Sequence, residues 1–196
     1  MERKRVHVGL SSLTRAHRLA AAFAFSLLVG LFARISVDLP LSPVPITGQS
    51  FAVLLCGALF GPRLAAVSLL MYLIEGALGL PVFAGGKGGI DVFFGATAGF
   101  LIAFPFAGAM VGYLSVRGWD RRLIDATLAM TLGTLLIMGI GALWLGVYLK
   151  NVGAWQSLSA LADMAIFPYL PGAALKIVVA AGIVWALRRR LSLRLT

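Results

Sequence analysis

Long apolar runs that carry almost no charge constrain this chain more than any other feature of its sequence. Hydrophobic residues make up 60% of its 196 residues and charged residues only 12%, which is too little polar side chain to cover a water-soluble globule. A helix needs about 20 mostly apolar residues to cross a bilayer, so the chain has room for about five to seven spans and none for a separate soluble domain. The sequence therefore predicts an integral membrane protein.

The positions of the apolar runs predict an all-α bundle of six transmembrane helices, which forms a single membrane domain over residues 19–190. The expected spans are 19–37, 46–60, 63–78, 93–115, 123–149 and 170–187. A basic leader at 1–18 precedes them, and a tail follows at 191–196. The leader resembles the start of a signal peptide, but Arg34 and Ile35 make a poor cleavage site because they are not small, so we expect the leader to be retained.

Basic residues are distributed unevenly over the connections of this six-span arrangement. With the N-terminus inside, all but four of the 17 Lys and Arg residues lie in inner segments or termini; the exceptions are Arg34, Lys87, Lys150 and Lys176. This is the bias of the positive-inside rule, which predicts cytoplasmic termini for a multi-pass protein of the bacterial inner membrane. The net charge of +10 then reflects orientation and contact with lipid. Nucleic-acid binding is not expected, because the basic residues are scattered without interleaved aromatic residues.

A glycine-rich stretch at 76–95 cannot be ordinary helix. It reads GALGLPVFAGGKGGIDVFFG, and its glycines and Pro81 break a helix while they allow backbone to approach a ligand closely. Three ionisable residues, Glu75, Lys87 and Asp91, lie in or beside it. We interpret the stretch as part of a small polar site at the outer mouth of the bundle. A flexible connection between two helices is the alternative.

The loop at 38–50 and the segment at 150–172 are expected on the same outer face. Prolines make the first of these loops extended and stiff. Thr47, Gln49 and Ser50 then offer polar groups where the second span begins and where free backbone N–H groups are available. These side chains are candidates for ligand binding, and helix capping by Thr47 and Ser50 is the alternative.

Lys176 lies within the last predicted span, roughly 9 Å below its outer end at 1.5 Å per residue. An ammonium group at that depth must reach the interface, pair with an acid or face a polar cavity. One reading is an ion pair with Glu75, which lies at a similar depth. The other is that Lys176 receives an anionic group or a carbonyl of a ligand. Phe83 and Tyr169 are expected to supply apolar walls, with a place in the interfacial aromatic belt as the alternative.

Small residues recur every fourth position on the first span, at Ala16, Ala20 and Ala24. Such a ridge lets another helix come close. It serves either a partner protein or packing within the same bundle. The glycine pairs on the fourth span, Gly95 with Gly99 and Gly108 with Gly112, are assigned to internal packing.

Catalytic chemistry finds little support in the sequence. The histidines, His7 and His17, lie in the basic leader, so no span offers a zinc site or a Ser-His pair. The glycine-rich run at 85–89 lacks the Ser or Thr of a phosphate-binding loop, so ATP hydrolysis must belong to another chain. We expect no enzyme activity, metal or cofactor. The alternative is an intramembrane enzyme that uses Glu75, Asp91 or Asp163 as acid or base.

Four motifs, taken together and in order, resemble the BioY family. They are VPITGQS at 44–50, LFGPR at 59–63, GLPVFAGG at 79–86 with a later Phe-Gly at 94–95, and PYLPGxxxK at 168–176. The resemblance covers residues 17–190. It implies the biotin-binding S component of an energy-coupling-factor transporter, with six helices and a biotin pocket near the outer face that is covered by the loops after the first and third spans. It also implies uptake powered by a transmembrane coupling subunit and ATP-binding cassette subunits.

The resemblance further implies that Lys176 binds biotin and that the alanine ridge docks the coupling subunit. The candidate ligand-binding residues are Lys176, Thr47, Gln49, Glu75, Phe83, Gly86, Asp91 and Tyr169. This sequence departs from the family pattern at Ala173, where aspartate is usual, and one acceptor for a ureido N–H is therefore missing. Glu75, Asp91 or Asp163 replaces it, or affinity is lower, or the ligand differs.

Overall fold

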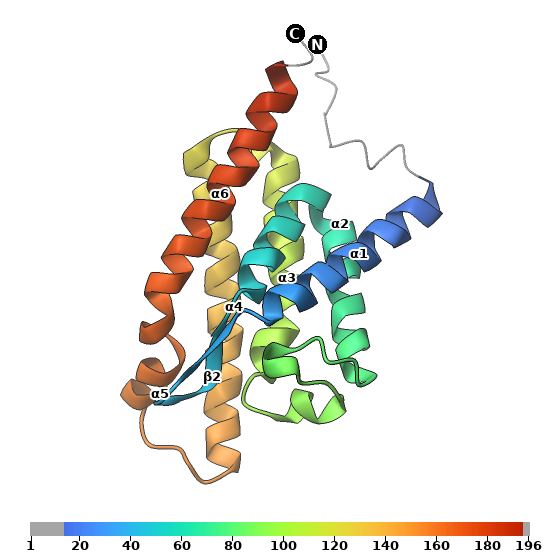
Figure 1. Ribbon diagram of the computed structural model, residues 1–196. Coiled ribbons are helices and arrows are strands. Elements are labelled where there is room, and N and C mark those ends of the chain that lie inside the picture. The colour runs from blue at the N-terminus through green and yellow to red at the C-terminus, as the bar shows by residue number, and fades with distance from the viewer. Residues whose placement is uncertain (1–13, 194–196) are drawn as a thin grey trace.

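Apolar helices dominate the computed structural model, which describes residues 14–193, with side chains up to residue 190 (Figure 1). Five helical stretches in this part of the chain are long and apolar enough to cross a membrane. The long helices are α1 (Arg15–Ala33), α2 (Gln49–Ala77), α3 (Ala98–Leu114), α4 (Leu123–Asn151) and α6 (Leu170–Leu193), and the short α5 (Leu158–Ala165) precedes α6. Single turns of 3₁₀ or π helix occupy Ala84–Gly86, Ile90–Phe94, Ser115–Trp119 and Phe167–Tyr169. The prediction of a helical membrane protein is thus confirmed.

Helix α2 turns back on itself and contains two of the predicted spans. Gly61 has φ 76° and ψ 175°, a conformation that suits glycine, and Pro62 follows it. The side chains of Gln49 and Tyr72 are hydrogen-bonded, although 23 residues of straight helix would separate them by about 35 Å. The halves 49–60 and 62–77 therefore run antiparallel, as Figure 1 shows.

A β-hairpin follows α1, so the prediction of a purely α-helical chain is wrong here. Strand β1 (Ser36–Leu39) pairs antiparallel with β2 (Ser42–Thr47), with Ser36 opposite Thr47. The prolines of this segment cannot continue a helix, and proline is tolerated in a two-stranded sheet because every strand has a free edge. As a result α1 ends at Ala33 rather than at 37, and α2 begins at Gln49 rather than at 46.

The first and last long helices also extend beyond the outer ends of the predicted spans. Helix α1 begins at Arg15, four residues before the predicted start, because the Thr14 hydroxyl caps it by accepting a hydrogen bond from the His17 N–H at 3.4 Å. At the other end α6 continues to Leu193. The rest of the predicted leader, residues 1–13, and the last three residues of the predicted tail lie outside the described residues.

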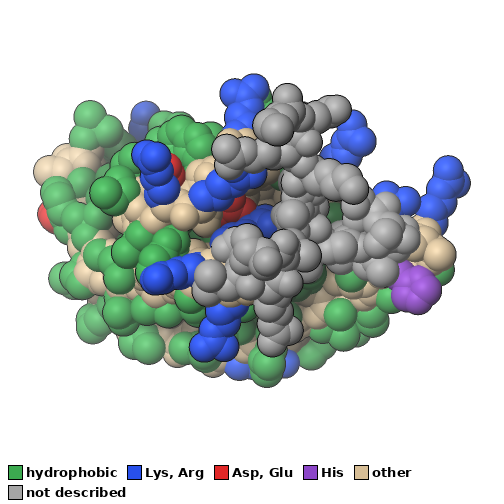
Figure 2. Space-filling view, turned by 90° about the horizontal axis from the view of Figure 1, so that it is seen from above, with side chains coloured by type: hydrophobic (Ala, Val, Ile, Leu, Met, Phe, Trp, Pro, Cys, Tyr) green, Lys and Arg blue, Asp and Glu red, His purple; other side chains and the backbone are tan. Residues whose placement is uncertain are grey.

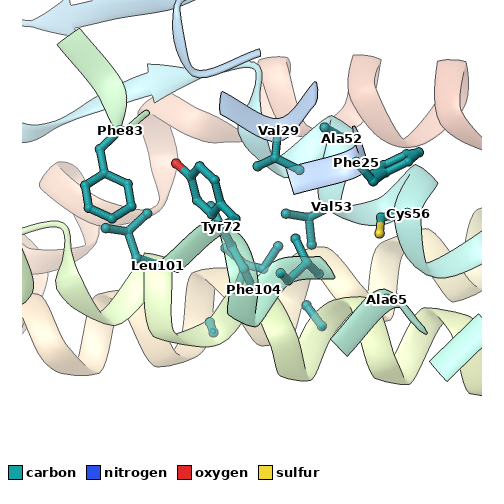
Figure 3. Packing of buried hydrophobic residues seen from close by; sticks show 14 residues of the cluster. Phe25, Val29, Ala52, Val53, Cys56, Ala65, Tyr72, Phe83, Leu101 and Phe104 are labelled. Atoms are coloured by element: carbon teal, nitrogen blue, oxygen red, sulfur yellow. The ribbon is translucent and has the colours of Figure 1, made fainter. Parts of the chain in front are cut away.

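The predicted role of the glycines on α3 in internal packing is confirmed for three of them. An added Cβ would lie 2.2 Å from Trp144 Cβ of α4 at Gly99, 2.4 Å from Leu69 Cδ1 of α2 at Gly108, and 2.5 Å from the Gly61 backbone at Gly112. The missing side chains let α3 contact both neighbours closely. The core lies around this helix; one cluster of buried residues, centred on Tyr72 and Phe104, fills the space between α1, α2 and α3 (Figure 3).

Gly112→Val is expected to destabilise the protein by about 1–3 kcal/mol or more, because the added carbon atoms meet backbone atoms of Gly61 and Pro62 that cannot rotate away. Thermal unfolding in detergent measures the effect. Gly139→Val on α4 is the matched control, since a Cβ at Gly139 has no neighbour within 4 Å. Equal losses of stability in the two variants would contradict the proposed close packing.

The two ends of the bundle differ in chemistry. The hairpin, residues 84–94 and α5 lie at one end, which we call the loop end, whereas α6 finishes at the other, the basic end (Figure 1). Figure 2 looks onto the basic end and shows Lys and Arg side chains gathered across it. There Arg188 forms an ion pair with the buried Asp120 at 2.5 Å, and the Ser115 hydroxyl donates to the same carboxylate at 3.0 Å. This pair ties α6 to the end of α3.

Candidate functional site

A cavity of about 350 Å³ lies at the loop end of the bundle, within the size range of small-molecule sites. All three connections predicted to share one face contribute to it, through residues such as Asp38, Phe83 and Tyr169. Helices α3 and α4 supply an apolar wall made by Phe100, Leu101, Phe104, Ile137 and Met138. Polar side chains line the cavity from the hairpin, the start of α2, the glycine-rich stretch and α6, and they include Asp38, Gln49, Lys87 and Lys176. Such a site suits a small molecule that is mostly apolar with a few polar groups.

Lys176 contributes a positive charge from α6 to the wall of the cavity. It is half-buried, and its ammonium group donates to the Thr47 carbonyl at 2.5 Å and to the Ser50 hydroxyl at 3.1 Å. Both acceptors are neutral, and no Asp or Glu within residues 14–193 forms a salt bridge with Lys176. One of its three N–H groups and its whole charge remain available to a ligand.

Glu75 lies elsewhere, so the predicted ion pair with Lys176 is wrong. Its carboxylate faces α1, where Oε1 accepts a hydrogen bond from the Ser26 hydroxyl at 2.6 Å. The side chain is 8% exposed, and Oε2 has no hydrogen-bond partner. Glu75 does not line the cavity, because its position on the second half of α2 points it toward α1.

Thr47 and Gln49 line the cavity, as predicted, but the protein uses several of their polar groups itself. The Thr47 hydroxyl donates to Gln49 Oε1 at 2.9 Å, and Gln49 Nε2 donates to the Tyr72 hydroxyl. Helix capping by Thr47 or Ser50 is not observed, since Gly48 is the capping residue of α2 and no side chain bonds there. The reason is that strand β2 extends to Thr47, so the helix begins two residues later.

Tyr169 and Phe83 form part of the cavity wall rather than the outer surface of the bundle. The Tyr169 hydroxyl donates to the Val44 carbonyl and lies 3.0 Å from the Ser42 hydroxyl. It thereby joins the start of α6 to the hairpin. Phe83 is 2% exposed and packs edge-on against Tyr72, with ring centroids 5.4 Å apart. The aromatic-belt alternative is therefore wrong for Phe83, whereas Tyr169 is half-buried as well as part of the cavity wall.

Gly86 and Asp91, two further candidates, do not line the cavity. Gly86 has φ 72°, and a Cβ there would lie 2.9 Å from Arg34 Nη1. Asp91 is exposed, and so is Asp163. The three carboxylates of the enzyme alternative, which include Glu75, are thus all absent from the cavity. The structure gives that alternative no support.

Several lining residues were not predicted, and Asp38 matters most among them. It is the one Asp or Glu among the described residues that lines the cavity, and Ala173 lines the same cavity. The suggestion that Glu75, Asp91 or Asp163 replaces the missing aspartate is therefore wrong, because none of the three lines the cavity. Asp38 begins the proline-containing loop at 38–50, and a charged residue in that outer loop was a signal that could have identified it. Thr134, in the middle of α4, also lines the cavity. Nothing in the sequence of this mainly apolar span indicated that Thr134 would face a cavity.

The alanine ridge faces away from the bundle. Ala16, Ala20 and Ala24 are all exposed, whereas the buried face of α1 carries residues such as Phe25 and Val29. The alternative of packing within the same bundle is therefore wrong. Large exposed apolar side chains border the ridge at Leu19, Phe23, Leu27 and Leu31.

The fold and the cavity define a multi-pass membrane protein with a cavity of small-molecule size at one end of its helical bundle. The sequence profile described as the BioY family matches residues 3–193. The chain belongs to the BioY family.

Relatives support this assignment over most of the chain. The probable biotin transporter BioY of Pyrococcus horikoshii is 42% identical over 131 residues, which cover 67% of this chain and 75% of the relative. The biotin transporter BioY of Rhodobacter capsulatus is 40% identical over 169 residues, which cover 78% of this chain and 86% of the relative. The biotin transporter BioY of Rhizobium etli is 35% identical over 175 residues, which cover 86% of this chain and 90% of the relative.

A solved structure has the same fold. The crystal structure of the S-component for biotin from an ECF-type ABC transporter superimposes with a TM-score of 0.74 at 24% sequence identity. The alignment covers 90% of this chain and 95% of that structure.

Proposed function

We propose that this chain is the substrate-capturing S component of a biotin uptake transporter and that it binds biotin in the cavity at the loop end. The observation that carries this proposal is a cavity of about 350 Å³ with an apolar wall and a half-buried lysine, Lys176, whose acceptors in the described residues are both neutral. Biotin has an apolar thiolane ring and alkyl chain, a ureido group and a carboxylate, which match such a site. Membership of the BioY family, whose relatives are named as biotin transporters, supports the same ligand.

The polar groups of the cavity suggest how biotin is held. The free N–H of Lys176 contacts either the carboxylate or the ureido carbonyl of the ligand. Asp38 takes the place of the missing aspartate near Ala173 and accepts a hydrogen bond from a ureido N–H. Phe83 and Tyr169 pack against the apolar parts, and Thr47 and Gln49 hold the hairpin side of the cavity in shape.

The loop end faces the outside of the cell, and the basic end faces the cytoplasm. Six spans result when the two halves of α2 cross separately, and these spans make up one membrane domain over 19–190. The leader at 1–18 and the tail at 191–196 are then cytoplasmic. The gathering of Lys and Arg side chains at the basic end supports this orientation in the bacterial plasma membrane.

Partner subunits supply the energy. The exposed ridge of Ala16, Ala20 and Ala24 docks a transmembrane coupling subunit, because small side chains let a partner helix approach the α1 backbone. ATP-binding cassette subunits attached to that partner hydrolyse ATP. The chain itself contributes binding and no catalytic group.

Isothermal titration of the purified protein against biotin, thiamine and riboflavin tests the proposal. We expect one biotin bound per chain, recovered chemically unchanged, and no heat of binding from the other two vitamins. Tighter binding of thiamine or riboflavin would contradict the choice of ligand. Chemical conversion of bound biotin would favour the enzyme alternative.

A further inference from the structure

Thr134 is the polar side chain that α4 presents to the cavity. The cavity-lining residues of this helix, which the structure describes in full, are Thr134, Ile137 and Met138. Their spacing of three and four residues places them on one face of α4. Ile137 and Met138 are apolar, and Thr134 is only 8% exposed. A hydroxyl group is therefore buried in a part of the wall that is otherwise apolar.

The hydroxyl proton of Thr134 is already used within α4. Its Oγ1 donates to the Met130 carbonyl, one turn earlier in the helix, at 2.9 Å. Threonine often forms such a bond to the carbonyl four residues before it. The hydroxyl group has a single proton but two lone pairs. Thr134 can therefore offer a ligand only an acceptor, and the ligand atom that pairs with it must carry a proton.

The packing of the adjacent residue places Thr134 near the inner end of the cavity. A Cβ at Gly133 would lie 2.7 Å from Leu54 Cδ2 of α2. Leu54 follows Ser50 by four residues, which corresponds to about 6 Å further from the loop end along α2. Ser50 is the residue whose hydroxyl accepts from Lys176. Thr134 thus lies about one helical turn deeper in the bundle than the ammonium group of Lys176.

A donor group of a ligand would be costly to bury here without a partner. An N–H placed against Ile137 or Phe104 of the same wall loses its hydrogen bond to water and gains none. An N–H directed at Thr134 Oγ1 keeps a partner. An ether oxygen or a carbonyl at that place has no proton to share with the lone pairs of Thr134. This side of the cavity therefore favours a ligand that carries an N–H group.

The ureido ring of biotin has two N–H groups, which point away from each other on either side of its carbonyl. Two acceptors on different parts of the wall are therefore needed. Asp38 lines the cavity from the hairpin and Thr134 lines it from α4. We propose that Thr134 is a further ligand-binding residue, whose hydroxyl oxygen accepts a hydrogen bond from the ureido N–H that Asp38 does not contact. The inference rests on the proposed function, since the ligand is biotin.

Thr134→Val tests this role, because valine keeps the shape of threonine and removes the hydroxyl group. Isothermal titration of the purified protein is expected to give a dissociation constant for biotin about tenfold higher than that of the natural protein. The helix should tolerate the change, since the backbone N–H of residue 134 still bonds to the Met130 carbonyl within α4. An unchanged dissociation constant would overturn the proposal.

Thr131→Val is the matched control on the same helix. The Thr131 hydroxyl donates to the Thr127 carbonyl, also at 2.9 Å, and Thr131 does not line the cavity. This variant loses the same kind of helix bond without changing the cavity wall, so its biotin affinity should stay within about twofold of the natural value. Equal losses of affinity in Thr131→Val and Thr134→Val would assign the effect to the helix, and the proposal would fail.

Thr134→Ser separates the acceptor from the shape of the side chain. Serine keeps the hydroxyl group and loses the methyl group, so we expect a dissociation constant within about threefold of the natural value. If Thr134→Ser loses as much affinity as Thr134→Val, the volume of the side chain matters rather than its oxygen. That result would also overturn the proposed hydrogen bond.

The titrations distinguish failure of this inference from failure of the proposed function. If the natural protein does not bind biotin, both fail. If it binds biotin and Thr134→Val binds equally well, only the role of Thr134 fails. If Thr134→Val does not accumulate in the membrane, Thr134→Cys takes its place, because a thiol of similar size is only a weak acceptor. Natural affinity for biotin in Thr134→Cys would then refute the contact.

Discussion

Lys176→Ala is expected to weaken biotin binding by at least about tenfold, because it removes the half-buried ammonium group that α6 contributes to the cavity wall. Nothing else in the described part of α6 supplies a cation to this wall. Isothermal titration in detergent measures the change. The fold should survive, since Lys176 contacts only a backbone carbonyl and one hydroxyl.

Lys150→Ala is the matched control for this substitution. Lys150 lies in the last turn of α4 near the loop end, is exposed, and packs over the Trp155 ring with its nitrogen 4.9 Å from the ring centre, outside the cavity. Titration with the primary amide of biotin then identifies the group that Lys176 contacts. If Lys176 binds the carboxylate of biotin, the Lys176→Ala substitution should change the affinity for the amide only a little. Equal affinity of Lys176→Ala and the natural protein for biotin would exclude any role in binding.

Ala20→Trp is expected to reduce recovery of the assembled transporter more than about tenfold while biotin affinity stays unchanged. A large ring in the middle of the exposed ridge keeps a partner helix from approaching the α1 backbone. The cavity is not affected, because α1 contributes no residue to its wall. The measurement is co-purification of the coupling subunit of the same organism with a tagged S component.

Ala186→Trp on α6 controls for the added bulk, because Ala186 is also exposed on a long helix. We expect this variant to assemble normally. Co-purification of Ala20→Trp at the natural level would show that the ridge is not the docking face. A loss of biotin binding in Ala20→Trp would indicate misfolding instead, and Ala24→Trp would then repeat the test one turn further along α1.

Features that depend on local composition were predictable from the sequence. The run at 123–149 is mostly apolar, with Asp125 as its one charged residue, and it forms α4, which extends only two residues further. Gly61 and Pro62 break the helix locally, so the turn within α2 could be placed correctly. The depth of Lys176 was also correct, because α6 begins at Leu170 and a fixed rise per residue sets the position of the side chain.

Features that depend on which faces meet were predicted less well. Glu75 and Lys176 lie at similar depths in the sequence analysis, yet Glu75 contacts Ser26 of α1 and Lys176 contacts Thr47 of β2. Depth along a helix is a local property, whereas the direction of a side chain around it depends on every neighbouring helix. The same limit explains why Asp38 was not named as a lining residue and why the hydrogen bond between Gln49 and Tyr72 was not predicted.

The sequence by itself determined a membrane-embedded helical chain, the end of the bundle that carries the site, and the lysine at its wall, because hydropathy, helix-breaking residues and charge bias act locally. Only the tertiary structure decided that residues 36–47 form a hairpin, that the alanine ridge is exposed, and that the Tyr72 hydroxyl donates to the Val82 carbonyl. These three features depend on contacts between segments far apart in the chain. Each is selected by the packing and hydrogen bonding of the whole bundle.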